Sequence, residues 1–444
     1  MKHYKTMMRT GCMLLTLALL PAGSAGIAAE PQALTLEATL AVAQENNRDI
    51  LVAVQESQIA AARVREERSA AMPDIRWGGT YTRTLRNPAF FVDFDGDIEK
   101  LTIGAKNSIT QALILDQALY SGGKVGTAIK LSKDFLELTE TELSHTRRVV
   151  RHEVTKQFYT ILMAREALRI AEETLTQGQR YHRNVEQRYA QGLVSEFELL
   201  RSEVQSVNHE PGVIQAENSL NLSRTSLMNL LTLDTKSAVN FQGELEYVPV
   251  DPQLRIQLPA EAATRRTDYQ QLTIQQRMRH LNIKLERGER LPTLRLLAKW
   301  QHDGVSNDFV FGKLERVWSS DVALRLEVPI FDGFRASART QQALIETEKL
   351  DQRMAQLQEA IDLEIQQADL RMKEAEKRLG VQERNIEQAR RAYDIAQVRF
   401  NNGLGTQLEV FDSQLDVVVN ELGHVQAIYD YLIAKTDWEF AIGL

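Results

Sequence analysis

The chain carries two copies of one sequence pattern. Each copy has an arginine, an aromatic residue, a glycine-leucine pair and a hydroxyl residue in the same order: Arg188-Tyr189, Gly192-Leu193 and Ser195, then Arg399-Phe400, Gly403-Leu404 and Thr406. These matching residues lie 211 positions apart, whereas Asp49 and Asp268 lie 219 apart. The first copy is therefore eight residues longer somewhere between the two groups. Fold and function are best interpreted per repeat.

Residues 1–29 have the pattern of a secretory signal peptide, with basic residues, an apolar run from Cys12 to Leu20 and then small residues. The apolar run is far shorter than the roughly 20 residues of a membrane-spanning helix. No later segment of the sequence approaches that length. Cys12 is the only cysteine, so we expect no disulfide and no thiolate chemistry in the mature chain.

The formal net charge is −7 at pH 7. Removing the three basic residues of the leader leaves the mature chain near −10, which is −7 minus 3. This charge argues against a nucleic-acid-binding surface. Only ten prolines occur in 444 residues, and long stretches are rich in Ala, Glu, Gln, Leu and Arg. That composition favours very long helices.

Apolar residues after Leu350 recur at spacings of mainly three and four, which is the seam of a coiled coil. The first of them are Met354, Leu357, Ile361, Ala368, Met372, Ala375 and Leu379. Each repeat is expected to hold a helix from just after Gly122 or Gly333 to about Gly192 or Gly403. A helix of about 65 to 70 residues is roughly 100 Å long. No single globular core needs such a helix.

The glycines at the ends of these helices predict tight turns into a returning, antiparallel helix. Ser195 and Thr406 are the N-cap candidates of the returning helices. Ordinary helix hairpins explain the local geometry, and only their repetition at the ends of long arms suggests a docking role. Pro211-Gly212 predicts a kink or break in the first returning helix, either to bend it inward or as an incidental loop. The matching Leu422-Gly423 should only soften its helix.

Each repeat opens with a helix, expected over Leu36–Ala71 and Ala260–Arg290, and continues with two strands. The strands are expected over Asp74–Thr84, Ile109–Leu119, Thr293–His302 and Asp321–Ile330. The segments between paired strands, Arg86–Lys106 and Asp303–Trp318, are expected to be long exposed loops.

The predicted order of domains is the signal peptide 1–29, the first repeat 30–235, an inter-repeat segment 236–259 and the second repeat 260–444. The inter-repeat segment is expected to be structured, with short strands beside the helices, because Val239, Phe241, Leu245 and Val248 favour burial.

Strands of about ten residues with one apolar face, in an exported chain, suit an outer-membrane β-barrel. The soluble alternative is a β-sandwich. Four strands cannot close a barrel, because the smallest known type has about eight. Several chains must therefore share one barrel, if the sheet spans lipid. Two copies would give eight strands with a filled interior, and three would give twelve with room for a pore.

The resemblance to a known family rests on several motifs in order. They are the opening Leu34-Thr35-Leu36-Glu37-Ala38, the strand ends Leu119-Tyr120-Ser121-Gly122-Gly123 and Pro329-Ile330-Phe331-Asp332-Gly333, and the turns Arg188 to Ser195 and Arg399 to Thr406. Together they resemble the TolC-type outer-membrane efflux protein family over nearly the whole mature chain. Each motif alone is weak, but the ordered and duplicated set is strong.

This resemblance implies a homotrimer in the outer membrane of a Gram-negative bacterium. A twelve-stranded β-barrel would continue into a long α-helical barrel across the periplasm. An inner-membrane transporter would hand substrates to it through a periplasmic adaptor protein, and the trimer would be a passive exit duct. The family implies no enzyme activity and no cofactor.

Two family sites can be placed on this sequence. The turns with Gly192, Leu193 and Ser195, and with Gly403, Leu404 and Thr406, match the hairpin tips where the adaptor docks, although a leucine beside a glycine cap is also an ordinary capping contact. Glu409 and Asp412 match two acidic residues at the periplasmic entrance. Six carboxylates from three copies would favour cations there. The alternative is a solvated helix face.

The family closes its entrance through a tyrosine, an arginine and an aspartate on neighbouring helices. The matching positions here are Phe400, Gly405 and Glu198, so two of the three polar partners are missing. We therefore expect an entrance that opens more easily, held by other contacts.

The sequence contains no metal-ligand spacing, nucleotide-binding loop or catalytic signature. The competing class is a secreted coiled-coil structural or adhesive protein, which does not explain two matched pairs of strands. Within the channel interpretation, the sequence does not identify the cargo as drug, solvent, metal or protein.

Overall fold

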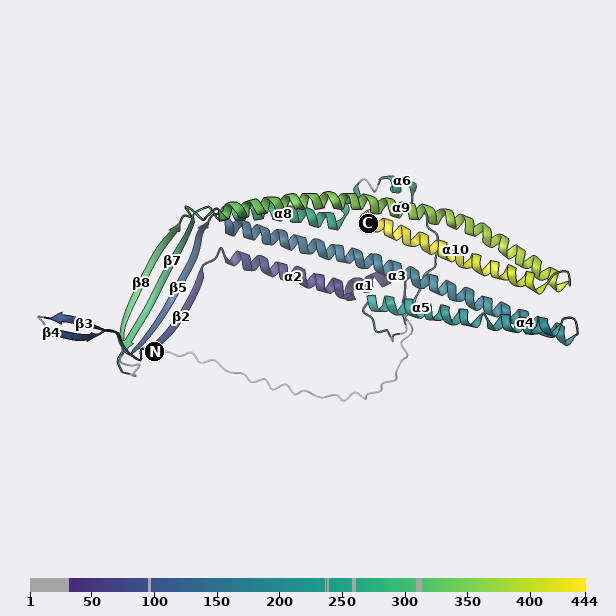
Figure 1. Ribbon diagram of the computed structural model, residues 1–444, viewed down its shortest axis with the longest axis horizontal. Helices are drawn as coiled ribbons and strands as arrows, with labels where there is room; N and C mark the ends of the chain where they lie inside the picture. Colours follow the sequence, from purple (N-terminus) through teal and green to yellow (C-terminus); the bar gives the residue numbers. More distant parts are fainter. Residues whose placement is uncertain (1–31, 95–96, 236, 238, 258–260, 309–313) are drawn as a thin grey trace, which may run out of the picture.

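The chain forms an elongated molecule with a sheet at one end and helices running away from it (Figure 1). The structure is a computed structural model that describes residues 32–94, 97–235, 237, 239–257, 261–308 and 314–444. The predicted signal peptide lies outside the described residues. Within the described ranges, no helix is both long and apolar enough to cross a membrane.

The helices follow the duplicated order of the sequence. Their bounds are α1 Leu36–Asn46, α2 Arg48–Ser69, α3 Lys124–Ala190, α4 Glu196–Val207, α5 Glu210–Leu230, α6 Pro252–Gln257, α7 Ala262–Arg265, α8 Thr267–Gly288, α9 Arg335–Asn401 and α10 Gln407–Ala441. The strands are β1 Gln32–Leu34, β2 Asp74–Arg83, β3 Ala89–Phe94, β4 Asp97–Thr102, β5 Asn107–Ser121, β6 Val239–Phe241, β7 Thr293–Ser306 and β8 Glu315–Glu327.

The two long helices are confirmed, because α3 and α9 each contain 67 residues. Both run from the sheet to the far hairpin tips (Figure 1). The seam predicted on α9 is buried, including Ile361, Met372 and Leu379. Near the sheet, α2 packs on α3, α3 on α8 and α8 on α9. Toward the tips, α3 packs on α4, α5 and α10, and α10 packs on α9. Four helices therefore lie side by side both near the sheet and toward the tips, and we call these regions the two helical levels.

The opening helices are not continuous, contrary to expectation. In the first copy Asn47 has extended backbone (φ −63°, ψ 129°) between α1 and α2. Its Oδ1 accepts from the backbone N–H groups of Asp49 and Ile50, and its Nδ2 donates to the Leu230 carbonyl 2.9 Å away. The break recurs 219 residues later at Arg266 (φ −69°, ψ 128°), between α7 and α8. The helix break thus occurs in both copies, but its side chain is the Asn47 amide in the first and the Arg266 guanidinium in the second.

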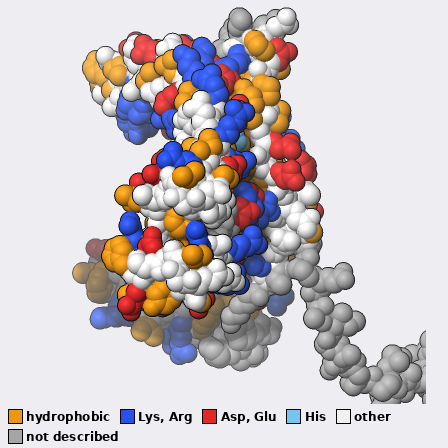
Figure 2. Space-filling view, turned by 90° about the vertical axis from the view of Figure 1, so that its right-hand side faces the viewer, with side chains coloured by type: hydrophobic (Ala, Val, Ile, Leu, Met, Phe, Trp, Pro, Cys, Tyr) orange, Lys and Arg blue, Asp and Glu red, His pale blue; other side chains and the backbone are white. Residues whose placement is uncertain are grey.

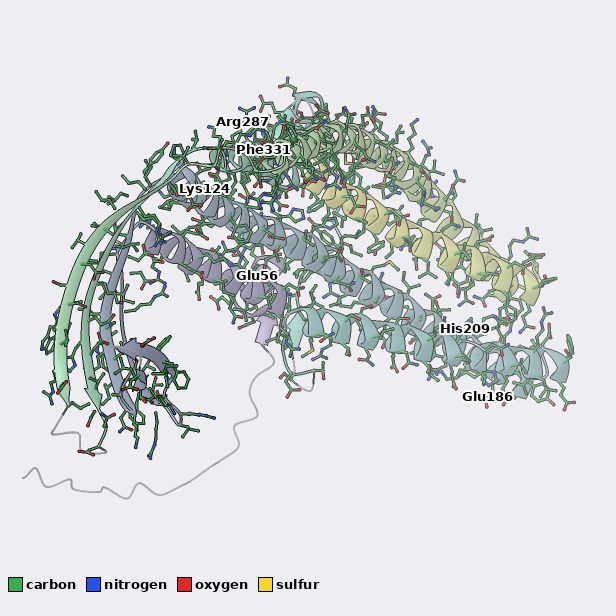
Figure 3. The ribbon with its side chains drawn as sticks, turned by 60° about the vertical axis from the view of Figure 1, so that its left-hand side comes forward. Glu56, Lys124, Glu186, His209, Arg287 and Phe331 are labelled. Atoms are coloured by element: carbon green, nitrogen blue, oxygen red, sulfur yellow. The ribbon has the colours of Figure 1, made fainter. Side chains whose placement is uncertain are left out.

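The returning helices differ between copies, as the sequence predicted. In the first copy α4 and α5 are separated at Asn208–His209, and Pro211 lies in the first turn of α5, where its missing N–H costs least. In the second copy α10 runs unbroken through Leu422-Gly423. Figure 3 places His209 toward the tips and Lys124 at the strand end of the helices.

The sheet is antiparallel with the order β2-β5-β7-β8, so each repeat contributes one hairpin. Its two faces differ in chemistry. The register places apolar side chains on one face, which we call the apolar face: Ile75, Trp77, Tyr81, Ile109, Leu113, Leu115, Leu296, Ala298, Trp300, Trp318, Val322, Leu324 and Leu326. The polar face carries ion pairs and hydrogen bonds, such as Arg295 with Asp116 at 2.8 Å and Thr110 with Asp303 at 2.8 Å.

The predicted loops between strands are largely wrong. Residues 89–102 form a second hairpin, β3 paired with β4, that projects beyond the sheet (Figure 1). The eight extra residues of the first copy fall in this region, because β2 and β5 align with β7 and β8 at the two offsets. In the second copy β7 and β8 extend into the predicted loop, and β8 ends at Glu327 rather than Ile330. The paired strands of the hairpins are longer than the strands that composition alone predicted.

The inter-repeat segment packs against the helices as predicted, with one exception. Its strand β6 pairs in parallel with β1, and Val239 and Phe241 join a core with Val154, Phe158 and Leu162 of α3. Val248, expected to be buried, is 51% exposed. A second core surrounds the end of α10.

The turns from strand to long helix require left-handed backbone at two successive residues. In the first copy these are Gly122 (φ 63°) and Gly123 (φ 76°), and in the second Gly333 (φ 67°) and Phe334 (φ 66°). A Cβ on Gly122 would lie 2.6 Å from the Gly288 carbonyl oxygen, so this glycine is also needed for close packing. Phe334 is the exception, since a bulky residue adopts this conformation at a cost.

Replacing Phe334 by glycine is expected to stabilise the protein. Relief of left-handed strain is worth about 1–2 kcal/mol, and the extra freedom of glycine in the unfolded chain takes back about 0.4–1 kcal/mol. Thermal unfolding followed by circular dichroism in detergent measures the difference. The control is Gly333→Ala, which has open space for its Cβ but a positive φ. It should destabilise, and a Phe334→Gly variant that also destabilises would contradict the strain argument.

Candidate functional site

The hairpin tips repeat one backbone motif. In the first tip the Gly192 N–H donates to the Tyr189 carbonyl (2.8 Å) and the Leu193 N–H to the Arg188 carbonyl (3.0 Å). The second tip has the same bonds from Gly403 to Phe400 (3.0 Å) and from Leu404 to Arg399 (2.9 Å). Both glycines have φ near +70° (72° and 71°), which completes the glycine C-cap. Leu193 and Leu404 are 64% and 74% exposed.

The N-caps of the returning helices use equivalent glutamates differently. The Ser195 hydroxyl accepts from the Glu198 N–H, and the Glu198 carboxylate accepts from the Ser195 N–H at 2.9 Å, which is a capping box. In the second copy the Thr406 hydroxyl accepts from the Glu409 N–H. The Glu409 carboxylate instead lies 3.8 Å from the Arg399 guanidinium. The Glu198 carboxylate thus accepts a hydrogen bond within its own helix cap, whereas the Glu409 carboxylate lies near the Arg399 side chain.

The predicted acidic pair lies on the first turns of α10. Glu409 and Asp412 are both exposed and three residues apart, so they share a helix face. Gly405 lies against Glu409, since a Cβ there would be 3.1 Å from Glu409 Oε2 and 3.2 Å from Arg399 Cβ. These two carboxylates lie at tips that also carry Arg399, Arg188 and Arg201.

Aromatic and arginine side chains join the two hairpins at the tips. Tyr181 of α3 packs on Phe400 of α9 and Phe411 of α10, with ring centroids 5.6 and 5.2 Å apart. Arg188 lies 5.0 Å from the Phe400 ring and Arg201 lies 5.8 Å from the Phe411 ring. We call these five residues the aromatic clasp. Phe400 is 6% exposed, whereas its equivalent Tyr189 is 41% exposed.

Glutamines extend the clasp but leave polar atoms unsatisfied. Gln407 Nε2 donates to the Glu198 carbonyl at 3.3 Å, which links α10 to α4. Gln407 Oε1 and Gln414 Nε2 are buried without hydrogen-bond partners among the described residues. The Tyr181 hydroxyl lies beside Gln407 without good hydrogen-bond geometry, and burial raises the pKa of its phenol. Each such atom costs about 1–3 kcal/mol, so this contact is less stable than its apolar packing suggests.

The structure places most predicted site residues near the hairpin tips, and their contacts within one chain are now defined. Phe400 is a buried ring, Glu198 is a capping residue and Gly405 is a point of close packing. Sequence reasoning missed Tyr181, Arg188 and Arg201 as partners of Phe400 and Phe411. The available signal was an aromatic residue in the last three turns of the predicted helix, since Tyr181 lies nine residues before the end of α3.

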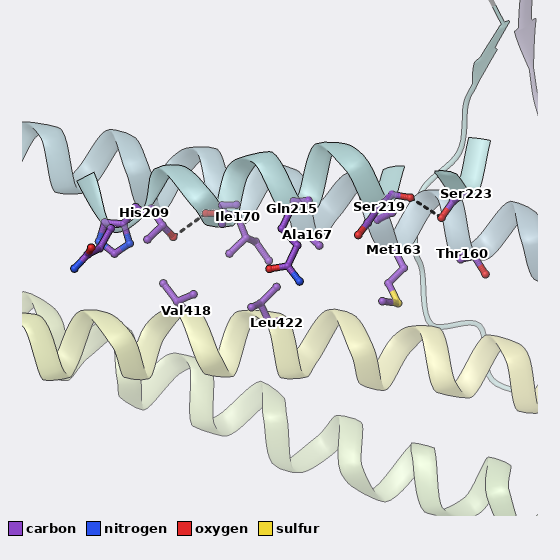
Figure 4. A pocket seen from close by; sticks show the side chains of 16 residues that line it. Thr160, Met163, Ala167, Ile170, His209, Gln215, Ser219, Ser223, Val418 and Leu422 are labelled. Carbon is purple, nitrogen blue, oxygen red and sulfur yellow. Dashed lines mark hydrogen bonds between the residues drawn. The ribbon is translucent and has the colours of Figure 1, made fainter. Parts of the chain in front are cut away.

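A cavity of about 620 Å³ separates the hairpins farther from the tips. Figure 4 shows Val418 and Leu422 of α10 facing residues of α3 and α5, including Met163 and Ile170. His209, at the α4–α5 break, packs on Gly178 and borders the cavity, and burial lowers the pKa of its imidazole. Since contact between hairpins is interrupted here, the clasp is the main tie at the tips.

The face that contains the tips is mixed in charge. Viewed from that end, basic, acidic and hydrophobic side chains alternate over the surface (Figure 2). Among the described residues, no group of three or more histidine, cysteine or acidic side chains is placed to hold a metal ion.

Comparison with protein families gives a match to the outer membrane efflux protein family over residues 39–232 and 258–444. The two matched segments correspond to the two repeats. The cobalt-zinc-cadmium resistance protein CzcC of Cupriavidus metallidurans is 23% identical over 219 residues, which are 49% of this chain and 47% of that protein. The chain thus spans about half the length of this curated relative.

Solved structures show the same fold. The outer membrane protein VceC of Vibrio cholerae superposes with a TM-score of 0.75 at 15% identity, over 92% of this chain and 96% of that one. The CmeC outer membrane channel of Campylobacter jejuni superposes with a TM-score of 0.76 at 16% identity, over 92% and 85%.

Proposed function

Because the chain belongs to the outer membrane efflux protein family, we propose that three copies form one exit duct across the outer membrane and into the periplasm. The observation that carries this proposal is the matching number of strands and helices in the protomer. Four strands and, at both helical levels, four helices lie side by side. Three copies would give twelve strands, enough for a barrel with room for a pore, and twelve helices to continue it as a tunnel.

The chemistry of the sheet supports the same proposal. A transmembrane barrel that holds water needs an apolar outer face and a polar lumen. The apolar face and the ion-paired polar face meet that requirement in one protomer. The edges β2 and β8 remain without partners in the four-stranded sheet, and pairing with neighbouring copies would remove them. The family match over both repeats sets aside the secreted coiled-coil alternative.

We propose that Glu409 and Asp412 form the periplasmic entrance and that the aromatic clasp holds it closed. Removing both charges, as Glu409→Ala with Asp412→Ala, is expected to lower the preference for cations over anions in planar bilayers, because six carboxylates leave the mouth. The control is Glu196→Ala with Glu203→Ala, two exposed acids on α4. An unchanged reversal potential in the double variant would contradict the proposed acidic mouth.

We propose that the tips with Leu193 and Leu404 dock a periplasmic adaptor that connects the duct to an inner-membrane transporter. Leu193→Asp with Leu404→Asp is expected to abolish export in cells, because two exposed apolar anchors become charged. Conductance of the purified variant should stay at the wild-type level. Leu85→Asp, at the opposite end of the molecule and 94% exposed, is the control. Normal export by the tip variant would contradict docking there.

A narrower proposal concerns the cargo. A ring of Glu409 and Asp412 carboxylates would favour cations, and the matched relative is named for cobalt, zinc and cadmium resistance. We propose divalent metal cations as cargo over drugs, solvents and proteins. A deletion strain should become sensitive to these metals and regain resistance with the intact gene. Sensitivity to organic drugs alone would contradict the metal assignment and leave the duct itself intact.

A further inference from the structure

The apolar face changes character along its strands. Starting from the helix end, Leu326, Leu324 and Val322 are aliphatic, Ser320 is small and polar, and Trp318 is aromatic. Trp318 stacks on Trp300, with centroids 4.8 Å apart, and lies 4.1 Å from the His302 ring. The next residue on this face of β8 is Arg316. An aliphatic band is thus followed by an aromatic band and then by a cation.

Arg316 is exposed and lies opposite Gly304 in the register, in the same cross-strand row as Tyr81. None of the ion pairs within the described part of the chain involves it.

The spacing matches the thickness of a membrane. Ten residues separate Leu326 from Arg316, which is about 34 Å along a strand. With a strand tilt of about 40°, this corresponds to a height of roughly 25 Å, the height of the apolar band of such barrels. Arg316 therefore lies where lipid hydrocarbon gives way to headgroups.

We propose that Arg316 binds the phosphate of an anionic lipid in the outer leaflet, with the Trp300–Trp318 stack packed beside it. A guanidinium binds phosphate oxygens in a bidentate manner and stays charged. Tryptophan rings are favoured at the membrane interface. The inference rests on the proposed barrel and adds a lipid class that the sheet selects at its outer rim.

The tryptophans of this chain provide the test. Of four tryptophans, Trp77, Trp300 and Trp318 lie on the apolar face, and Trp438 is 2% exposed in the helical core. Fluorescence quenching by lipids with brominated chains therefore reports contact with the apolar face. The purified protein is reconstituted in phosphatidylcholine vesicles containing brominated phosphatidic acid or brominated phosphatidylcholine, and the two quenching curves give a relative binding constant.

The wild type is expected to prefer phosphatidic acid. Arg316→Gln should weaken that preference about tenfold, the equivalent of a lost charge-assisted hydrogen bond, and Arg316→Lys should restore part of it. The matched control Arg325→Gln removes an arginine of the same strand from the polar face and should keep the preference. Inorganic phosphate in solution should not compete, since the site recognises a lipid.

Equal quenching by both lipids, or equal loss in Arg316→Gln and Arg325→Gln, overturns the lipid site while leaving the barrel intact. Competition by inorganic phosphate overturns it in favour of a free anion site. No quenching by any brominated lipid removes the barrel proposal itself, so the two failures are distinguishable.

Discussion

Replacing Arg266 by alanine is expected to lower the free energy of unfolding by about 3 kcal/mol, because it removes a buried side chain and leaves partly buried acceptors without their partner. Arg266 is 8% exposed between α7 and α8. Its guanidinium donates to Asp268 at 2.7 Å, to Glu364 of α9 and to the Ala441 carbonyl at 3.3 Å. One side chain therefore ties the start of α8 to α9 and to the end of α10. Thermal unfolding in detergent measures the loss.

The neighbouring Arg265 is the matched control. In the described part of the chain its ion pair is with Glu261, one turn earlier on the surface, so Arg265→Ala should cost about 0.5 kcal/mol or less. Equal destabilisation by the two variants would contradict the role given to the buried network.

Acid should distinguish Arg266→Ala from the wild type as well. Burial alone would raise the pKa of Asp268, but the Arg266 guanidinium outweighs it and holds this pKa below its ordinary value. In the wild type, stability from this carboxylate is present above about pH 4 and is lost as pH falls through the lower folded pKa. In the variant, no guanidinium opposes the effect of burial on Asp268, so protonation of this carboxylate becomes more favourable. The difference in free energy of unfolding between wild type and variant is therefore expected to become smaller as the pH falls. A difference that does not change with pH would contradict this linkage.

Replacing Phe400 by alanine is expected to open the entrance. The buried ring joins Tyr181 and Arg188 in the aromatic clasp, and truncating a buried phenylalanine costs about 3–5 kcal/mol. If the clasp is formed only in the closed state, a loss of about 3 kcal/mol shifts the equilibrium toward the open state by roughly a hundredfold. Single-channel conductance in planar bilayers should rise accordingly.

The duplicated sequence supplies the control, because Tyr189 is the equivalent residue of the first copy and is exposed. Tyr189→Ala should leave conductance unchanged. A Phe400→Ala protein that unfolds more easily but conducts like the wild type would make the clasp structural only. The unsatisfied atoms of Gln407 and Gln414 add a reason for easy opening, since water could reach both once the hairpins part.

Much of the fold was predictable because regular spacings of apolar residues extend over long stretches of this chain. The seam after Leu350 fixed the 67-residue α9, and the glycine turns placed both tips. Alternation identified the four strands of the sheet, although β8 begins at Glu315, six residues before the expected start at Asp321. These signals depend on local periodicity, which survives without knowledge of tertiary contacts.

The remaining features depend on contacts that no local pattern encodes. The break at Asn47 was readable as an Asx N-cap, but the break at Arg266 is specified by Glu364 and Ala441, far along the chain. The β3–β4 hairpin lies in a stretch rich in turn residues, where pairing outweighed composition. The clasp requires Tyr181 of one repeat to meet Phe400 and Phe411 of the other, which only the packing of two hairpins determines.

The most direct test of the duct is ion conductance across a planar bilayer that contains the purified protein, recorded for the wild type and for Phe400→Ala. The account predicts discrete, cation-selective current steps that are small in the wild type and larger in the variant. Absence of steps from both proteins, in preparations shown to be folded and inserted, would contradict the claim that this chain forms a channel.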